Sequence, residues 1–150
     1  MDSTESTLKH KKRIEELLIK AGEELSKRGK IHDNSKLESP EKELFDEHTH
    51  KLGGSIFGSE QYDTFLKDLK PALDHHYENN SHHPEHYENG IDGMNLFDLI
   101  ELFFDWKSSG ERHRGGNIYE SIKINKERFG ISDQLEKILQ NTAKYMNYEN

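Results

Sequence analysis

Histidine is the residue type that first suggests chemistry in this sequence, with ten copies among 150 residues. Typical composition would give about three or four in a chain of this length. The histidines are clustered, and the densest group lies within residues 75–86. Imidazoles mixed with carboxylates suit zinc, iron, manganese or nickel, whereas carboxylates alone favour magnesium or calcium. The histidine pattern therefore indicates a metal site.

Asp105 is the acidic residue that most needs a partner, because it stands in the most apolar stretch of the chain, residues 95–107. A carboxylate on a buried helix is costly unless it is paired with a base or bound to a cation. One interpretation is an ordinary salt bridge to arginine or lysine. Helical spacing also puts His10 and His76 on apolar faces, however, and one metal ion would satisfy all three side chains.

His32 and Asp33 are adjacent and offer two ligands from one short segment. The dipeptide by itself is a weak signal. Its position between His10 and Asp105, with Lys36 three residues later, strengthens the prediction of a metal site.

Periodic apolar residues predict the helices that must position these side chains. The expected spans are 7–28 ended by Gly29, 40–50, 59–76 with a kink or restart at Pro71, 95–107, 118–129 and 133–146. The 95–107 helix is apolar nearly all round, which is typical of a central, buried helix. We therefore predict an all-α helical bundle, one domain over 1–150 with an ordered core over about 7–146.

Composition narrows the possible functions. The net charge of −8 leaves no surplus of basic residues for generic binding to nucleic acid or to anionic membranes. The absence of cysteine excludes disulfides and thiolate zinc sites. No apolar run approaches the roughly 20 residues that cross a bilayer, and the polar first ten residues do not resemble a signal peptide. We expect a cytoplasmic protein whose ligand could still be a small phosphorylated molecule.

The order His10, then His32-Asp33, then Asp105 resembles the H…HD…D signature of the HD superfamily of metal-dependent phosphohydrolases, and residues 32–36 resemble its HDxxK variant. Residues 75–85 and 98–107 are more closely similar to an uncharacterised family of short HD-like proteins from phages and bacteria, a domain of unknown function. The resemblance covers roughly His10 to Thr142.

This resemblance implies an HD-like bundle and a ligand set. His10, His32, Asp33 and Asp105 would hold one metal ion. The additional histidines that hold a second ion in polynuclear HD branches are matched in kind by His76, His82 and His83. The choice between His75 and His76, and between His82 and His83, stays open, with the helical face favouring His76. One or two ions of manganese, iron, zinc, nickel or cobalt would fit, and magnesium is possible.

The implied activity is metal-dependent hydrolysis of a nucleotide or related small phosphoester. Lys36, Lys107 and Arg112 could neutralise phosphate oxygens. Glu85 or Glu101 could act as general base or orient a ligating histidine. The compressed histidine cluster lacks a following GYP tripeptide, which disfavours cyclic di-GMP cleavage, and no Glu-Asp pair follows Asp33, which disfavours alarmone hydrolysis.

Two alternatives belong to other classes. HD proteins that resemble inositol oxygenase hold two irons and activate dioxygen, and their ligand sets are also rich in histidine. A compact phage-type module could instead bind a nucleotide or a host protein without turnover. The identity of the bound metal distinguishes an oxygenase from a hydrolase, because oxygenase chemistry requires iron. A hydrolysis screen distinguishes a binding module from a hydrolase. The sequence leaves the substrate and the oligomeric state open.

Overall fold

The computed structural model describes residues 2–52, 60–112 and 116–148, with all their side chains except those of 49–52, 60–63 and 66. Every regular element in these ranges is helical, which confirms the all-α prediction. The chain divides into two compact units, Met1–His32 and Asp33–Asn150, and each is described by itself. None of the described helices is long and apolar enough to cross a membrane.

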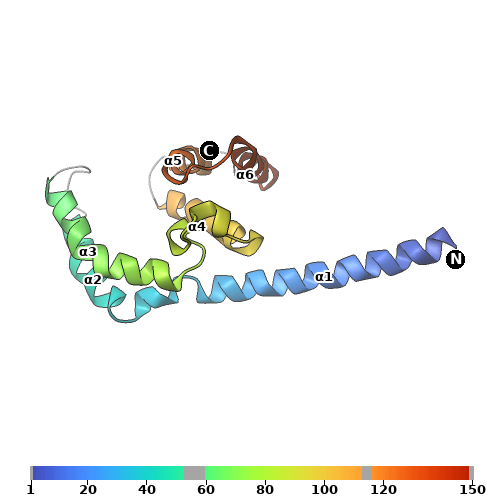
Figure 1. The fold of residues 1–150 in the computed structure, drawn as a ribbon, viewed down its shortest axis with the longest axis horizontal. Helices are drawn as coiled ribbons and strands as arrows, with labels where there is room; N and C mark the ends of the chain where they lie inside the picture. Colours follow the sequence, from blue (N-terminus) through green and yellow to red (C-terminus); the bar gives the residue numbers. More distant parts are fainter. Residues whose placement is uncertain (1, 53–59, 113–115, 149–150) are drawn as a thin grey trace. The chain divides into compact units, whose positions relative to one another are not determined.

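The first unit is a single long helix, α1 (Ser3–Ile31) (Figure 1). It continues past Gly29, where the sequence predicted its end, because that glycine does not adopt the left-handed conformation that stops a helix. Within this unit no residue of α1 is buried and Leu18 is 67% exposed, so the unit by itself does not cover the apolar stripe that the sequence predicted to include His10. The physical reason is that a unit made of one helix contains no second layer that could cover an apolar face.

The second unit begins with a short 3-10 helix, η1 (Asn34–Leu37), and a pair of packed helices, α2 (Glu41–Leu52) and α3 (Glu60–Asn79) (Figure 1). Pro71 lies inside α3, so the restart that the sequence allowed there does not occur. Packing against α2 compensates the backbone hydrogen bond that proline removes. The predicted start of this helix at residue 59 lies outside the described residues.

The remaining helices are α4 (Leu96–Glu111), α5 (Ile118–Phe129) and α6 (Asp133–Tyr145), and the last two match the predicted bounds to within one residue. Helix α5 packs against both α4 and α6. The buried apolar cluster that they share consists of Leu102, Phe103, Trp106, Ile118, Ile122, Ile131, Leu139 and Ala143.

Helix α4 is covered on one face rather than all round, which corrects the prediction of a fully buried central helix. Its apolar residues Leu96 and Phe104 are 74% and 40% exposed. Asp105, next to Phe104, is half-buried. The physical reason is that the shared apolar cluster contacts only the α4 face carrying Leu102, Phe103 and Trp106.

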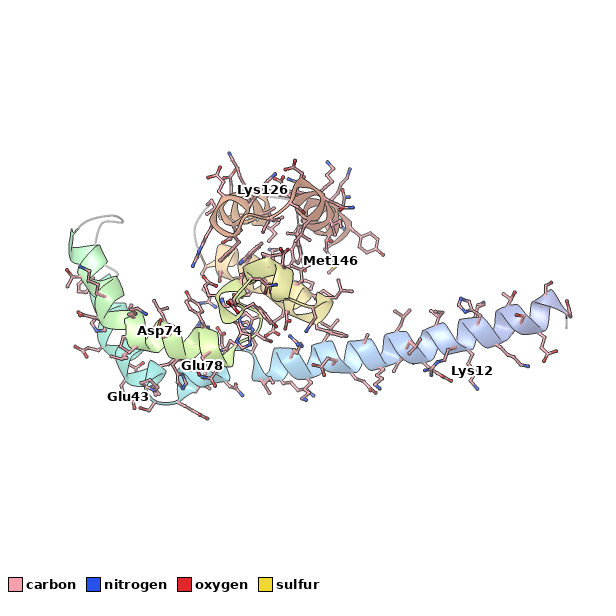
Figure 2. The ribbon with its side chains drawn as sticks, viewed as in Figure 1. Lys12, Glu43, Asp74, Glu78, Lys126 and Met146 are labelled. Atoms are coloured by element: carbon pink, nitrogen blue, oxygen red, sulfur yellow. The ribbon has the colours of Figure 1, made fainter. Side chains whose placement is uncertain are left out.

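Between α3 and α4 the chain forms two short 3-10 helices, η2 (Pro84–His86) and η3 (Gly90–Gly93). Many charged side chains project outward from the helices, among them Glu43, Asp74 and Glu78 (Figure 2). These solvated faces explain how a chain with 33% charged residues still folds.

Candidate metal centre

The second unit brings four of the predicted ligands together. One nitrogen or oxygen atom from each of Asp33, His76, His82 and His83 lies within 4.8 Å of the corresponding atoms of the other three. Asp33 immediately precedes η1, and His76 lies in the last turn of α3. The two other histidines lie in the turn between α3 and η2. Three short segments therefore converge on one point.

The distances within this cluster are those of atoms that could share an ion. Nε2 of His76 lies 3.3 Å from Oδ1 of Asp33 and 2.9 Å from Nε2 of His83. Nε2 of His82 lies 3.4 Å from the same Asp33 oxygen. Ligands about 2.1 Å from a tetrahedral ion are separated by about 3.4 Å. These three separations are close to that value, and the cluster has the mixture of imidazole and carboxylate that suits a transition metal.

Asp33 has a left-handed backbone, with φ of 56° and ψ of 19°. Aspartate is one of the few residues that tolerate this conformation. The turn sends Oδ1 towards the histidines while Oδ2 accepts a hydrogen bond from Lys36 Nζ at 2.7 Å. Burial alone would raise the pKa of Asp33, but hydrogen bonding with His76, His82 and Lys36 outweighs burial and holds the pKa well below its ordinary value. The carboxylate is therefore anionic.

His83 is held neutral. Burial lowers the pKa of His83 to about 3, and the charges of His82 and His76 act in the same direction. A neutral imidazole keeps a lone pair for coordination, so His83 needs to lose no proton from a cationic ring before it binds an ion.

We expect acid to destabilise the metal-free protein through His83. The unfolded chain protonates this residue below about pH 6.5, whereas the folded chain does so only at about pH 3. The neutral state of His83 therefore costs the folded protein no stability above pH 6.5. As the pH falls from 6.5 towards 3, protonation of the unfolded chain progressively lowers the free energy of unfolding. Urea unfolding in chelator between pH 7 and 4 should show a steeper decline for wild type than for His83→Gln, by at most about 1.4 kcal/mol per pH unit. Equal slopes would contradict the assignment.

His82 is 2% exposed and is oriented by α4. Its Nδ1 lies 3.2 Å from Oε1 of Glu101, so Nε2 faces the cluster. Asp105 lies one turn further along α4, with a carboxylate oxygen within 4.8 Å of a ring nitrogen of His82. Glu101 therefore has the position expected of a partner that orients a ligating histidine.

Glu41 is a buried carboxylate that the sequence did not single out. It is 0% exposed, and its two oxygens lie 2.7 Å from Nδ1 of His75 and 2.8 Å from Nδ1 of His76. The sequence showed only an acidic residue in the first turn of a helix, which is an ordinary complement to the helix dipole. Of the histidine pair left open, His76 faces the cluster and His75 lies behind it, on Glu41.

Asp98 is the fully buried member of the acidic residues on α4. Its carboxylate accepts hydrogen bonds from Ser81 Oγ at 2.7 Å, Tyr87 OH at 2.6 Å and the Asn95 backbone N–H at 3.0 Å. These bonds fasten both ends of the histidine-bearing turn to the start of α4. Asp98 thereby supports the position of His82 without facing the cluster.

The other predicted site residues are not among the four residues of this cluster. His10 is exposed on α1 and His32 follows its last turn, so both belong to the first unit and their role as ligands stays a prediction. Glu85 accepts a hydrogen bond from Arg128 at 2.7 Å. Lys107 donates one to Glu111 at 2.5 Å, and Arg112 is exposed at the end of α4. The catalytic roles expected of Lys36, Glu85 and Lys107 also stay predictions.

A comparison with protein families shows where the chain belongs. The model of the family of unknown function DUF5662 matches residues 1–145. The chain belongs to this family. DUF5662 membership confirms the expected relation to a family without an assigned function. No curated protein and no solved structure matches this DUF5662 chain.

Proposed function

We propose that this DUF5662 protein is a metal-dependent phosphohydrolase acting on a nucleotide or a related small phosphoester. The observation that carries the proposal is the convergence of one oxygen of Asp33 with Nε2 of His76, His82 and His83. The order of His10, His32-Asp33 and Asp105 along the chain adds support, because it resembles the ligand order of HD-type hydrolases.

The chemistry of the donor set fits a divalent transition metal such as manganese, iron, zinc, nickel or cobalt. Asp33 supplies a negative charge, and His83 is neutral. Both groups are therefore in the protonation state that coordination needs. Magnesium is a weaker candidate, because it prefers a set of oxygen ligands.

A bound divalent ion would supply Lewis acidity towards a phosphoryl oxygen and lower the pKa of a water molecule. The side chains around it would bind and orient the substrate. Lys36 Nζ is 2.7 Å from Asp33 and its side chain is 44% exposed, so it can reach a phosphate oxygen at the edge of the cluster. Glu101 keeps His82 turned towards the cluster, as a positioning residue. The substrate that we expect is a small cytoplasmic phosphoester.

Metal analysis and a hydrolysis screen test the proposal together. Wild-type protein should carry at least one transition metal ion per chain and hydrolyse members of a panel of nucleotides and phosphodiesters. Treatment with chelator should reduce the rate to background, and added manganese, nickel or cobalt should restore it. Protein that takes up no transition metal under any of these conditions would overturn the proposal.

The same experiment separates two alternatives. A ligand set rich in histidine also suits iron, so firmly bound iron with dioxygen consumption and no hydrolysis would indicate an oxygenase of the HD type. Metal binding without turnover of any substrate would indicate a module that binds a nucleotide or a protein.

A further inference from the structure

Glu41 makes an unusual set of contacts for a residue in the first turn of a helix. Its carboxylate is completely buried and accepts from two imidazoles, with Oε1 on His75 and Oε2 on His76. Ser35 adds a third hydrogen bond. Burial raises the pKa of Glu41, but the hydrogen bonds from His75, Ser35 and His76 outweigh it and lower the pKa below its ordinary value. Glu41 therefore stands directly behind a predicted metal ligand, with an imidazole Nδ1 within 2.8 Å of each of its oxygens.

The neighbouring groups fix which nitrogen of His76 carries the proton. Oε2 of Glu41 lies 2.8 Å from Nδ1 of His76, and a carboxylate oxygen accepts, so His76 donates from Nδ1 to Glu41. Asn80 is close to the same nitrogen, but the two hydrogens of its amide have better partners, Ser35 Oγ at 2.7 Å and the His76 carbonyl at 2.8 Å. Nδ1 of His76 is thus committed to Glu41, whether the ring is neutral or charged.

The opposite nitrogen of His76 points into the cluster. Nε2 lies 3.3 Å from Asp33 and 2.9 Å from His83. Because Glu41 holds the proton on Nδ1, a proton on Nε2 is the one that His76 would release on binding a metal ion. The lone pair of Nε2 is then directed at the centre of the four-residue cluster. Carboxylates that accept from the far nitrogen of a ligating histidine fix its ring and raise its basicity.

We propose that Glu41 is a positioning residue of the metal centre, which holds His76 with Nε2 towards the ion, and that His75 secures the second oxygen of Glu41. The inference rests on the proposed metal site and deepens it. His75, whose side chain is 35% exposed, acts from the solvent side and is not a ligand.

Glu41→Gln is the sharpest test, because glutamine keeps the shape of the side chain but has one acceptor and one donor. It cannot accept from both imidazoles, so one Nδ1 must lose its proton. Calorimetry and the visible absorption of bound Co²⁺ should show an affinity about 10- to 100-fold weaker than wild type. Glu43→Gln is the matched control, since Glu43 is in the same first turn of α2 but exposed, and it should bind Co²⁺ as wild type does.

A second measurement needs no metal. Nitrogen-15 spectra of chelator-treated wild type, assigned by comparison with His76→Gln, should show a downfield Nδ1–H resonance from His76 that is shifted upfield or lost in Glu41→Gln. A His76 ring protonated only at Nε2, or equal Co²⁺ affinity in Glu41→Gln and Glu43→Gln, would overturn the inference. If Glu41→Gln does not fold, the presence or absence of the His76 Nδ1–H resonance in wild type tests the inference. Wild type that binds no Co²⁺ refutes the metal site, and the spectrum still reports separately on Glu41.

Discussion

Asp33→Asn is expected to lower the affinity for Co²⁺ by roughly 100-fold or more and to reduce hydrolysis to background. Asp33 is the one carboxylate in the four-ligand cluster, and its Oδ1 lies 3.3 and 3.4 Å from the nitrogens of His76 and His82. Asparagine removes the charge that attracts the cation. It also tolerates the left-handed backbone at this position, so the change should not strain the turn.

The matched control for this variant is Asp46→Asn. Asp46 also pairs with a lysine of its own helical turn, Lys42 at 2.6 Å. Its side chain is 67% exposed, however, and it is not among the proposed ligands. Its replacement should leave metal content and hydrolysis unchanged. Metal stoichiometry and calorimetric titration measure both variants, and an Asp33→Asn protein that binds Co²⁺ as tightly as Asp46→Asn would refute the proposed centre.

Asp98→Ala should have the largest effect on stability, a loss of about 3 kcal/mol in the free energy of unfolding of the metal-free protein. The change leaves the half-buried hydroxyls of Ser81 and Tyr87 and the Asn95 N–H without their acceptor. It also removes the reciprocal cap at the start of α4. Urea unfolding followed by circular dichroism measures the difference.

The same variant should weaken metal binding, because Ser81 immediately precedes His82 and loses its anchor on α4. Asp92→Ala is the control, since Asp92 is an exposed acidic residue in η3, within the same connection. It should change the unfolding free energy by less than about 0.5 kcal/mol. Similar unfolding free energies for the two variants would show that Asp98 does not hold the turn.

Local patterns predicted most helices well and failed where packing decides. The bounds of α5 and α6 follow from apolar spacing with Asn117 and Ser132 as caps, which are properties of a few neighbouring residues. The predicted end of α1 at Gly29 was wrong because this glycine keeps a helical backbone, and the predicted full burial of α4 was wrong because packing covers one face. Spacing shows that a face is apolar, but it does not show whether another element covers that face.

The candidate site divides in the same way. Residue types indicated imidazole and carboxylate ligands, and the resemblance to HD proteins added His82 and His83 to Asp33 and His76 as expected ligands. They did not indicate Glu41, which lies 35 residues before His76, and they gave Asp105 rather than Asp98 as the acidic residue buried on α4.

The sequence by itself determined the helical class, the ordering of the helices and the chemical kind of ligand, because each depends on residue identity and on neighbours within a few turns. Only the tertiary structure decided which histidines share a point, which carboxylate stands behind His76 and which one fastens the turn of His82. Those relations depend on how α2, α3 and α4 bring together residues distant in the chain. Helical periodicity carries no information about such distances.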